Sequence, residues 1–170
     1  MPKTRGYSLP ELLICLLIGT LLLSLATPSL SSLLQNSRKT QQTNQLLGML
    51  HYARGTAVLD KRTITLCSGT PQCSKSNSWH ESLLVFADDN SNGIRDAGEA
   101  LLQQASLDHN YRWIWSSFGQ RSYVTYQRDG TTKALNGTFT LCHQGLALQQ
   151  VVISLSGRAR TQAPDTPACR

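Results

Sequence analysis

The pattern of apolar and polar positions divides the chain into one long helical segment and a region of short strands. No residue from Leu12 to Ser37 is charged, and Tyr7–Ala26, as a helix, reaches about 30 Å, the hydrocarbon thickness of a bilayer. Beyond this stretch, apolar residues recur every three or four positions as far as Ala57, which indicates an amphipathic helix. We therefore predict one helix, about Ser8 to Leu59, whose second half packs on the domain that follows.

After Lys61 the pattern changes to short apolar runs separated by turn residues, which is typical of β-strands. Asn136-Gly137 predicts a tight turn between two of these runs. A helix packed on antiparallel sheets, an α+β fold, follows from this order of elements. The predicted strands are Thr63–Cys67, Leu83–Phe86, Ala100–Gln103, Arg112–Trp115, Tyr123–Gln127, Thr138–Cys142 and Val151–Leu155.

The start of the chain combines a short basic segment, which ends at Gly6, with one carboxylate, Glu11, inside the apolar stretch. A carboxylate at this depth costs about 2.5–3.5 kcal/mol on membrane-insertion scales, so a functional role is the default interpretation. A cleavable secretory signal is the alternative, with Ser24-Leu25-Ala26 as its cleavage site. The length of the charge-free stretch and the position of Glu11 within the apolar segment Tyr7–Ala26 argue against that alternative.

Charge is distributed unevenly along the 170 residues, whose net charge is +6. Between Asp60 and His109 there are four basic and seven acidic residues, whereas Asn110–Arg170 has seven basic residues and two acidic ones. This asymmetry favours a surface that faces a polyanion, and a solvated basic face without a partner is the alternative.

Five cysteines are present, and Cys15 lies in the apolar helix as a small apolar residue. The other four form an even set, which allows three disulfide pairings. The short loop between Cys67 and Cys73 favours a local bridge and leaves Cys142 to pair with Cys169. A zinc site is the competing interpretation, but the spacing matches no zinc-ligand pattern, so disulfides in an oxidising compartment are favoured.

Residues 88–99 match the twelve-residue calcium-loop pattern, with Gly93 at the sharp turn. The flanks disagree with that motif, because a strand precedes it and no helix follows, and an ordinary Asx turn uses the same residues. We therefore expect no cofactor and keep calcium as the less favoured alternative. Its oxygen ligands would be Asp88, Asn90, Asn92, Asp96 and Glu99.

Catalysis has little support, because the four histidines are scattered along the sequence and no catalytic motif occurs. We expect that the protein is not an enzyme. Trp113 and Trp115 alternate with Arg112 and Ile114, which would suit either a base-stacking face or a strand with its aromatic rings in the core. We favour the core.

The beginning of the chain, Arg5-Gly6-Tyr7 through Glu11 and the apolar run, resembles the type IV prepilin signature. The resemblance implies that a prepilin peptidase cuts after Gly6, that Tyr7 becomes the methylated N-terminus, and that Glu11 neutralises the amine of a neighbouring subunit. It also implies a leader (residues 1–6), a transmembrane and filament-core helix (7–28) and a periplasmic domain (29–170). The protein would then cross the bacterial inner membrane once and join a pilus or pseudopilus.

Further motifs resemble the GspH/FimT family of minor pilins and pseudopilins, which implies the type IV pilin fold. The C-terminal Gly157-Arg158-Ala159-Arg160 is similar to FimT proteins that bind DNA during natural transformation. The other motifs are Leu66-Cys67, Cys73, Trp79, Val85-Phe86-Ala87-Asp88, Asp96-Ala97-Gly98-Glu99, Gly137-Thr138-Phe139 and Cys142.

In an extended segment, Arg158 and Arg160 point the same way and lie about 6.6 Å apart. This separation is close to that of successive phosphates along one strand, so both guanidinium groups would hold one backbone of double-stranded DNA. A structural minor pilin or type II secretion pseudopilin that does not bind DNA is the alternative. The candidate DNA-binding residues are Gly157, Arg158, Arg160, Lys133, Arg128 and Arg170.

Overall fold

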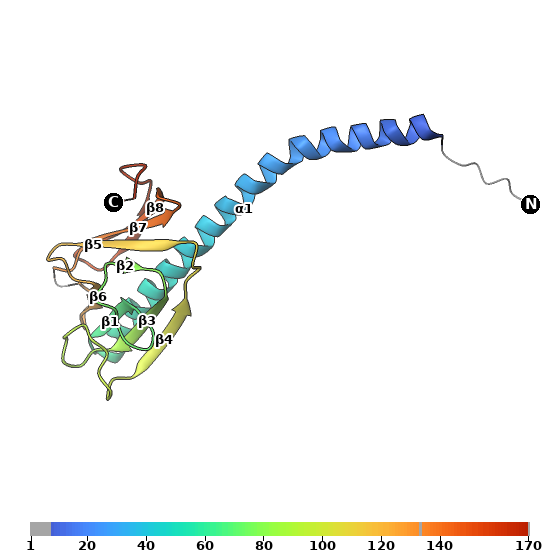
Figure 1. The fold of residues 1–170 in the computed structure, drawn as a ribbon. Coiled ribbons are helices and arrows are strands. Elements are labelled where there is room, and N and C mark those ends of the chain that lie inside the picture. Colours follow the sequence, from blue (N-terminus) through green and yellow to red (C-terminus); the bar gives the residue numbers. More distant parts are fainter. Residues whose placement is uncertain (1–7, 133, 170) are drawn as a thin grey trace, which may run out of the picture. The chain divides into compact units, whose positions relative to one another are not determined.

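The structure, a computed structural model, describes residues 8–132 and 134–169, without the side chains of residues 23–29. It divides into two compact units, residues 1–38 and 39–170. Helix α1, Leu9–Asp60, runs through both units (Figure 1). Its first turn resembles a capping box, because the backbone N–H of Ser8 donates to Glu11 Oε2 at 3.5 Å. It ends where Lys61 adopts a left-handed φ of 53°.

Among the described residues, no helix is both long enough and apolar enough to cross a bilayer. The predicted leader, Gly6 and the predicted N-terminal Tyr7 lie outside the described residues.

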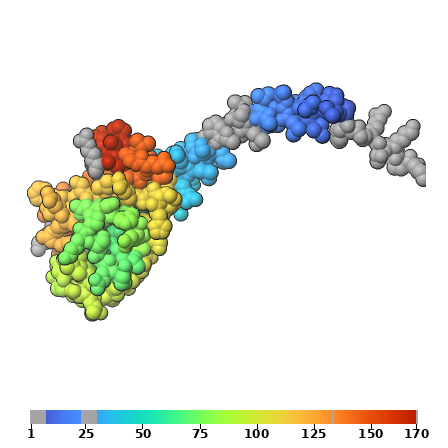
Figure 2. All heavy atoms as spheres, in the orientation of Figure 1, coloured from blue at the N-terminus to red at the C-terminus, as the bar shows by residue number. Residues whose placement is uncertain are grey.

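The strands form two antiparallel sheets in the second unit. The first sheet has the order β4-β3-β1-β6, and the second has the order β2-β5-β7-β8-β9. The first comprises β1 (Ile64–Ser68), β3 (Ser82–Ala87), β4 (Leu101–Ser106) and β6 (Tyr123–Tyr126). The second comprises β2 (Ser78–Trp79), β5 (Arg112–Ser117), β7 (Gly137–His143), β8 (Leu146–Ile153) and β9 (Ala159–Gln162). These strands pack into one continuous body in the space-filling view (Figure 2).

One hydrophobic core joins the second half of α1 to both sheets. The helix contributes Leu46, Met49, Leu50, Ala53 and Ala57 at the predicted three- and four-residue spacing. The sheets contribute the aromatic rings, which include Trp113 and Trp115 at 0% and 1% exposure. The ring of Trp115 stacks on Phe139, and their centroids are 4.2 Å apart. The tryptophans are therefore core residues, as predicted, and are not available to stack on bases.

The α+β class, the long helix and seven strands are confirmed. The tight turn predicted at Asn136-Gly137 is wrong, because Gly137 is the first residue of β7. A Cβ on Gly137 would lie 2.3 Å from the carbonyl oxygen of Ser116 on the neighbouring strand. Glycine is therefore required here for a close approach between strands and not for a turn.

Both predicted disulfides are present. Cys67 is bonded to Cys73, with the Cα atoms 5.6 Å apart, and Cys142 is bonded to Cys169, with the Cα atoms 6.0 Å apart. Cys15 is a free, exposed cysteine on α1. The second bridge lies beside an isolated β-bridge between Leu146 and Ala168, so the segment after β9 returns to the start of β8.

Candidate nucleic-acid interface

The two arginines singled out in the sequence lie where β8 connects to β9: Arg158 ends the connection, and Arg160 is the second residue of β9. We call residues 154–160 the arginine turn. The connection is closed by its own hydrogen bonds: the Ser154 N–H donates to the carbonyl of Arg158 at 3.0 Å, and the Gly157 N–H donates to the carbonyl of Ser154 at 2.9 Å. The Arg158 N–H donates to Ser154 Oγ at 3.3 Å. These bonds hold the backbone that carries Arg158.

Gly157 gives the arginine turn its shape. Its φ is +76°, in the left-handed region, and it is buried. A Cβ at this position would lie 2.0 Å from the carbonyl oxygen of Gly130. Gly157 belongs to the predicted DNA-binding set, but in the structure it is buried, and it lets the turn approach the loop that follows β6.

Arg54 of α1 holds the arginine turn through hydrogen bonds to two backbone carbonyls. Its Nε donates to the carbonyl of Gly130 at 2.9 Å, and its Nη2 donates to the carbonyl of Ser156 at 3.2 Å. The Thr132 N–H adds a third bond, to the carbonyl of Leu155 at 3.1 Å. The turn is thus held to the helix and to the loop after β6. Arg54 is not identifiable from the sequence as part of this site, because it lies within a helical pattern far from the basic C-terminal region.

Arg158 and Arg160 are both exposed, whereas Ala159 between them packs against the core. This alternation places both arginines on the outer side of the extended chain, as predicted. Arg160 pairs with Val152 in the β8–β9 register, so its backbone is fixed by the sheet. Within residues 8–132 and 134–169, no ion pair joins either guanidinium group to a carboxylate. Both positive charges therefore face solvent.

The predicted DNA-binding set has three further residues, Arg128, Lys133 and Arg170. Arg128 is exposed and acts on Asp89, a carboxylate that also forms two hydrogen bonds with Arg62, at 2.6 and 3.1 Å. The Arg62 hydrogen bond is the main cause that lowers the pKa of Asp89, and Arg128 adds a smaller electrostatic effect. Lys133 and Arg170 lie outside the described residues.

In the calcium-like loop, residues 88–99, the carboxylates of Asp88, Asp96 and Glu99 all accept hydrogen bonds from protein groups. Asp88 is buried and accepts hydrogen bonds from the N–H of Gly93, the N–H of Asn92 and the hydroxyl of Thr65, at 2.7–3.0 Å. Glu99 accepts from two backbone N–H groups, those of Asp89 and Asp96. Both side-chain amides, of Asn90 and Asn92, donate to Asp96.

This bonding is that of an Asx-stabilised turn, the favoured interpretation of the loop. Within the part of the chain that the structure describes, no group of three His, Cys, Asp or Glu side chains is arranged to hold a metal ion.

Three of the four histidines share one hollow, of about 490 Å³, although they are scattered along the sequence. They are His80, His109 and His143, and Arg112 lines the same hollow. Nδ1 of His143 lies 2.9 Å from the carbonyl of Asn110, so this nitrogen carries the proton. The His143 ring also stacks on Tyr111, with the centroids 4.6 Å apart. The histidine is therefore held by structural contacts.

Comparison with known proteins places this fold in a family. The profile of the family described as type II transport protein GspH matches residues 42–157. Two crystal forms of the type IV minor pilin FimU from Pseudomonas aeruginosa (strain PAO1) share the fold. One is 21% identical with a TM-score of 0.57, covering 75% of this chain and 98% of that one. The other is 20% identical with a TM-score of 0.58, covering 78% of this chain and 96% of that one.

Comparison with curated proteins gives no significant match. The GspH profile covers more than half of the chain, including the buried part of α1, both sheets as far as β8 and the first half of the arginine turn. The long helix and the antiparallel sheets agree with the pilin fold of FimU. The chain therefore belongs to the GspH family of minor pilins and pseudopilins.

Proposed function

We propose that this protein is a minor type IV pilin that binds double-stranded DNA without sequence preference and serves DNA uptake in natural transformation. The observation that supports this function is the pair Arg158 and Arg160, both exposed, without a carboxylate partner among the described residues, and carried by a turn fixed to α1. The function requires no cofactor and no catalytic step.

The physical basis is neutralisation of phosphate charge. A guanidinium group donates two hydrogen bonds in one plane and matches the geometry of a phosphate. Contacts of this kind release counterions, so the affinity falls steeply with salt, and they carry no base information. Because the backbone beneath both arginines is already ordered, the entropy lost on binding is that of the two side chains and not that of the backbone.

The filament part of the proposal concerns the N-terminus. A prepilin peptidase would cut after Gly6, the amine of Tyr7 would be methylated, and the helix would anchor the subunit in the inner membrane before assembly. In this monomer the Glu11 carboxylate accepts from Ser8 N–H at the start of α1. In a filament the same carboxylate would neutralise the amine of a neighbouring pilin subunit. A pair of opposite charges costs less free energy in apolar surroundings than either charge alone.

A salt-resolved DNA shift assay on the purified full chain tests the proposal. Replacing Arg158 and Arg160 with Gln should abolish or strongly weaken binding and reduce the slope of log affinity against log salt by about two, one for each lost phosphate contact. The control replaces Lys75 and Arg112 with Gln, which removes the same charge from other parts of the sequence. If the folded Arg158/Arg160 variant binds as tightly as the wild type, the arginine turn is not the DNA site.

A type II secretion pseudopilin that does not bind DNA is the second candidate function, and the match to the GspH profile favours it. The two candidates differ in the wild type itself. A pseudopilin would show no salt-dependent DNA binding and would co-purify with the other pseudopilins of a secretion system. A DNA-binding minor pilin would show the binding and would copurify with pilus subunits.

A further inference from the structure

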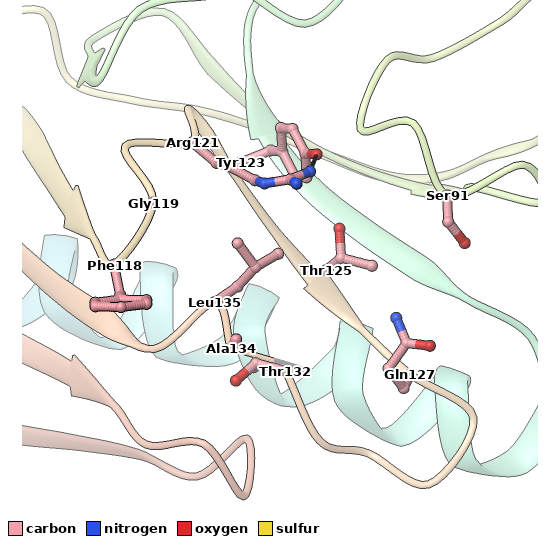
Figure 3. Close-up of a pocket in the computed structure, with 10 residues that line it drawn as sticks. All are labelled: Ser91, Phe118, Gly119, Arg121, Tyr123, Thr125, Gln127, Thr132, Ala134 and Leu135. Carbon is pink, nitrogen blue, oxygen red and sulfur yellow. Dashed lines mark hydrogen bonds between the residues drawn. The ribbon is translucent and has the colours of Figure 1, made fainter.

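A second hollow lies along the outer face of β6, the edge strand of the first sheet, and encloses about 410 Å³. We call it the β6 pocket. Its volume is in the range of small-ligand sites. Figure 3 shows side chains of β6 along one side, and the loops that precede and follow β6 along the others. The side chains that matter most are Phe118, Arg121, Tyr123, Thr125, Gln127 and Thr132.

The β6 pocket presents two aromatic rings. Phe118, the first residue of the loop between β5 and β6, is 76% exposed and belongs to neither hydrophobic cluster. Tyr123 is fixed: its ring lies so close to Gly93 that a Cβ there would be 2.2 Å away. On its other side the Arg121 guanidinium lies 5.7 Å from the ring centroid and hydrogen-bonds to the phenol oxygen. Both sides of the Tyr123 ring are thus occupied, and Phe118 is the ring that offers a face to a flat, aromatic ligand.

The polar groups of the β6 pocket indicate which charge and which hydrogen-bonding groups a ligand would carry besides a ring. Among the described residues that line the pocket, Arg121 carries a charge and none has a carboxylate. Within the described residues, the side-chain amide of Gln127 has no protein hydrogen-bond partner, so it can both donate to a ligand and accept from one. A planar ring, a hydrogen-bonding edge and a negative group together describe a nucleobase with its phosphate.

The β6 pocket and the arginine turn share one loop. Thr132 lines the pocket, its N–H donates to the carbonyl of Leu155, and its hydroxyl donates to the carbonyl of Ser154 at 3.3 Å. The loop after β6 therefore borders the pocket and is bonded to the turn that carries Arg158. A base that is paired within a duplex has no free face or edge to offer such a site, so a ligand from DNA would have to be an unpaired nucleotide.

We propose that the β6 pocket binds one unpaired nucleobase and its phosphate, with the base stacked on Phe118 and the phosphate at Arg121. The protein would then prefer DNA ends with a single-stranded overhang to blunt duplex. This inference rests on the proposed DNA binding, because the arginine turn would hold the neighbouring duplex.

Fluorescence anisotropy with the full chain tests the pocket on three probes of equal duplex length. The first is blunt, the second has an oligothymidine overhang, and the third has an abasic overhang of the same length. The thymidine overhang should bind about five- to 150-fold more tightly than the abasic one, which is the range for stacking of one base on an aromatic ring. Phe118→Ala should remove this ratio, and Phe118→Tyr should retain it.

A matched control is Leu146→Ala, which removes another exposed apolar side chain, 57% exposed, from β8. It should keep the ratio. The Arg158/Arg160 variant should weaken all three probes and leave the ratio unchanged. If the wild type does not bind the blunt duplex, the proposed function is refuted, but the assignment of the β6 pocket is not. Equal affinity for thymidine and abasic overhangs, or a ratio that survives Phe118→Ala, would overturn the assignment of the β6 pocket.

Discussion

The arginine turn provides a stability experiment in which the effect of a steric clash is separated from that of backbone strain. Gly157 and Gly145 have nearly the same φ, +76° and +80°. A Cβ on Gly157 would lie 2.0 Å from the Gly130 carbonyl oxygen and 3.1 Å from Arg54 Nε, whereas a Cβ on Gly145 would meet nothing within 4 Å. Alanine at either position therefore introduces similar strain, and only at Gly157 does it also introduce a clash.

The magnitudes follow from these surroundings. An L-residue in the left-handed region costs about 1–2 kcal/mol, and the smaller conformational freedom of the unfolded chain offsets about 0.4–1 kcal/mol of that. Gly145→Ala should therefore lower the free energy of unfolding by about 1 kcal/mol. Gly157→Ala adds an overpacking cost of about 1–3 kcal/mol, because the obstacle is backbone and cannot rotate away. Its total loss should be about 2–4 kcal/mol.

Urea unfolding of the full chain measures both values. The midpoint should fall further for Gly157→Ala, with an unchanged dependence on urea concentration, because neither variant changes the surface exposed on unfolding. Equal losses for the two variants would refute the reasoning, since they would show that the contact between Gly157 and Gly130 imposes no steric constraint. A Gly157→Ala variant as stable as the wild type would also refute the left-handed backbone at this position.

Two further predictions concern the disulfide and an ion pair. Replacing both Cys142 and Cys169 with Ala should lower the free energy of unfolding by about 3 kcal/mol in the chain-entropy model, because the bridge spans 27 residues. Calorimetry of the variant and of the wild type measures this loss. Arg62→Gln should raise the pKa of Asp89, which its hydrogen bond to Arg62 holds below the ordinary value, and carboxyl NMR titration would contradict this if the pKa did not move. Because the pKa of Asp89 is lowered in the folded state, the Arg62–Asp89 pair stabilises the folded protein at neutral pH. Its contribution to the free energy of unfolding is lost as the pH falls below about 4.

Much of the fold could be predicted because its determinants are local. The predicted helix, Ser8 to Leu59, differs by one residue at each end from α1, since its apolar spacing continues without a break. The disulfides could be paired because a loop as short as Cys67–Cys73 leaves one partner for each remaining cysteine.

Two strands were not predicted, for reasons of size and position. β2 has only the two residues Ser78 and Trp79, too few to show an alternation. β9, with the sequence Ala-Arg-Thr-Gln, is the last strand of its sheet, and none of its four residues is buried. An edge strand of this kind needs no apolar side to face a core, so the usual signal is missing.

The candidate site could be predicted only in part. Charge and spacing marked Arg158 and Arg160, and the structure places both on the surface. The support from Arg54 could not be predicted, because its two hydrogen bonds reach partners 76 and 102 residues away in the sequence. The β6 pocket was missed for the same reason, since its walls come from residue 91 and two loops that only the sheet topology brings together.

The position of β9 has a mechanical consequence. The strand is bounded on one side by the arginine turn, fastened to α1 through Arg54, and its downstream segment is tied covalently to β7 through Cys142–Cys169. A force applied to Arg160 along the strand would load the β8–β9 backbone hydrogen bonds in shear, and the disulfide would limit how far the segment after β9 can move away from β7. If these arginines bind DNA as proposed, a pull on that DNA would be transmitted through the arginine turn to α1 while β9 stays paired with β8.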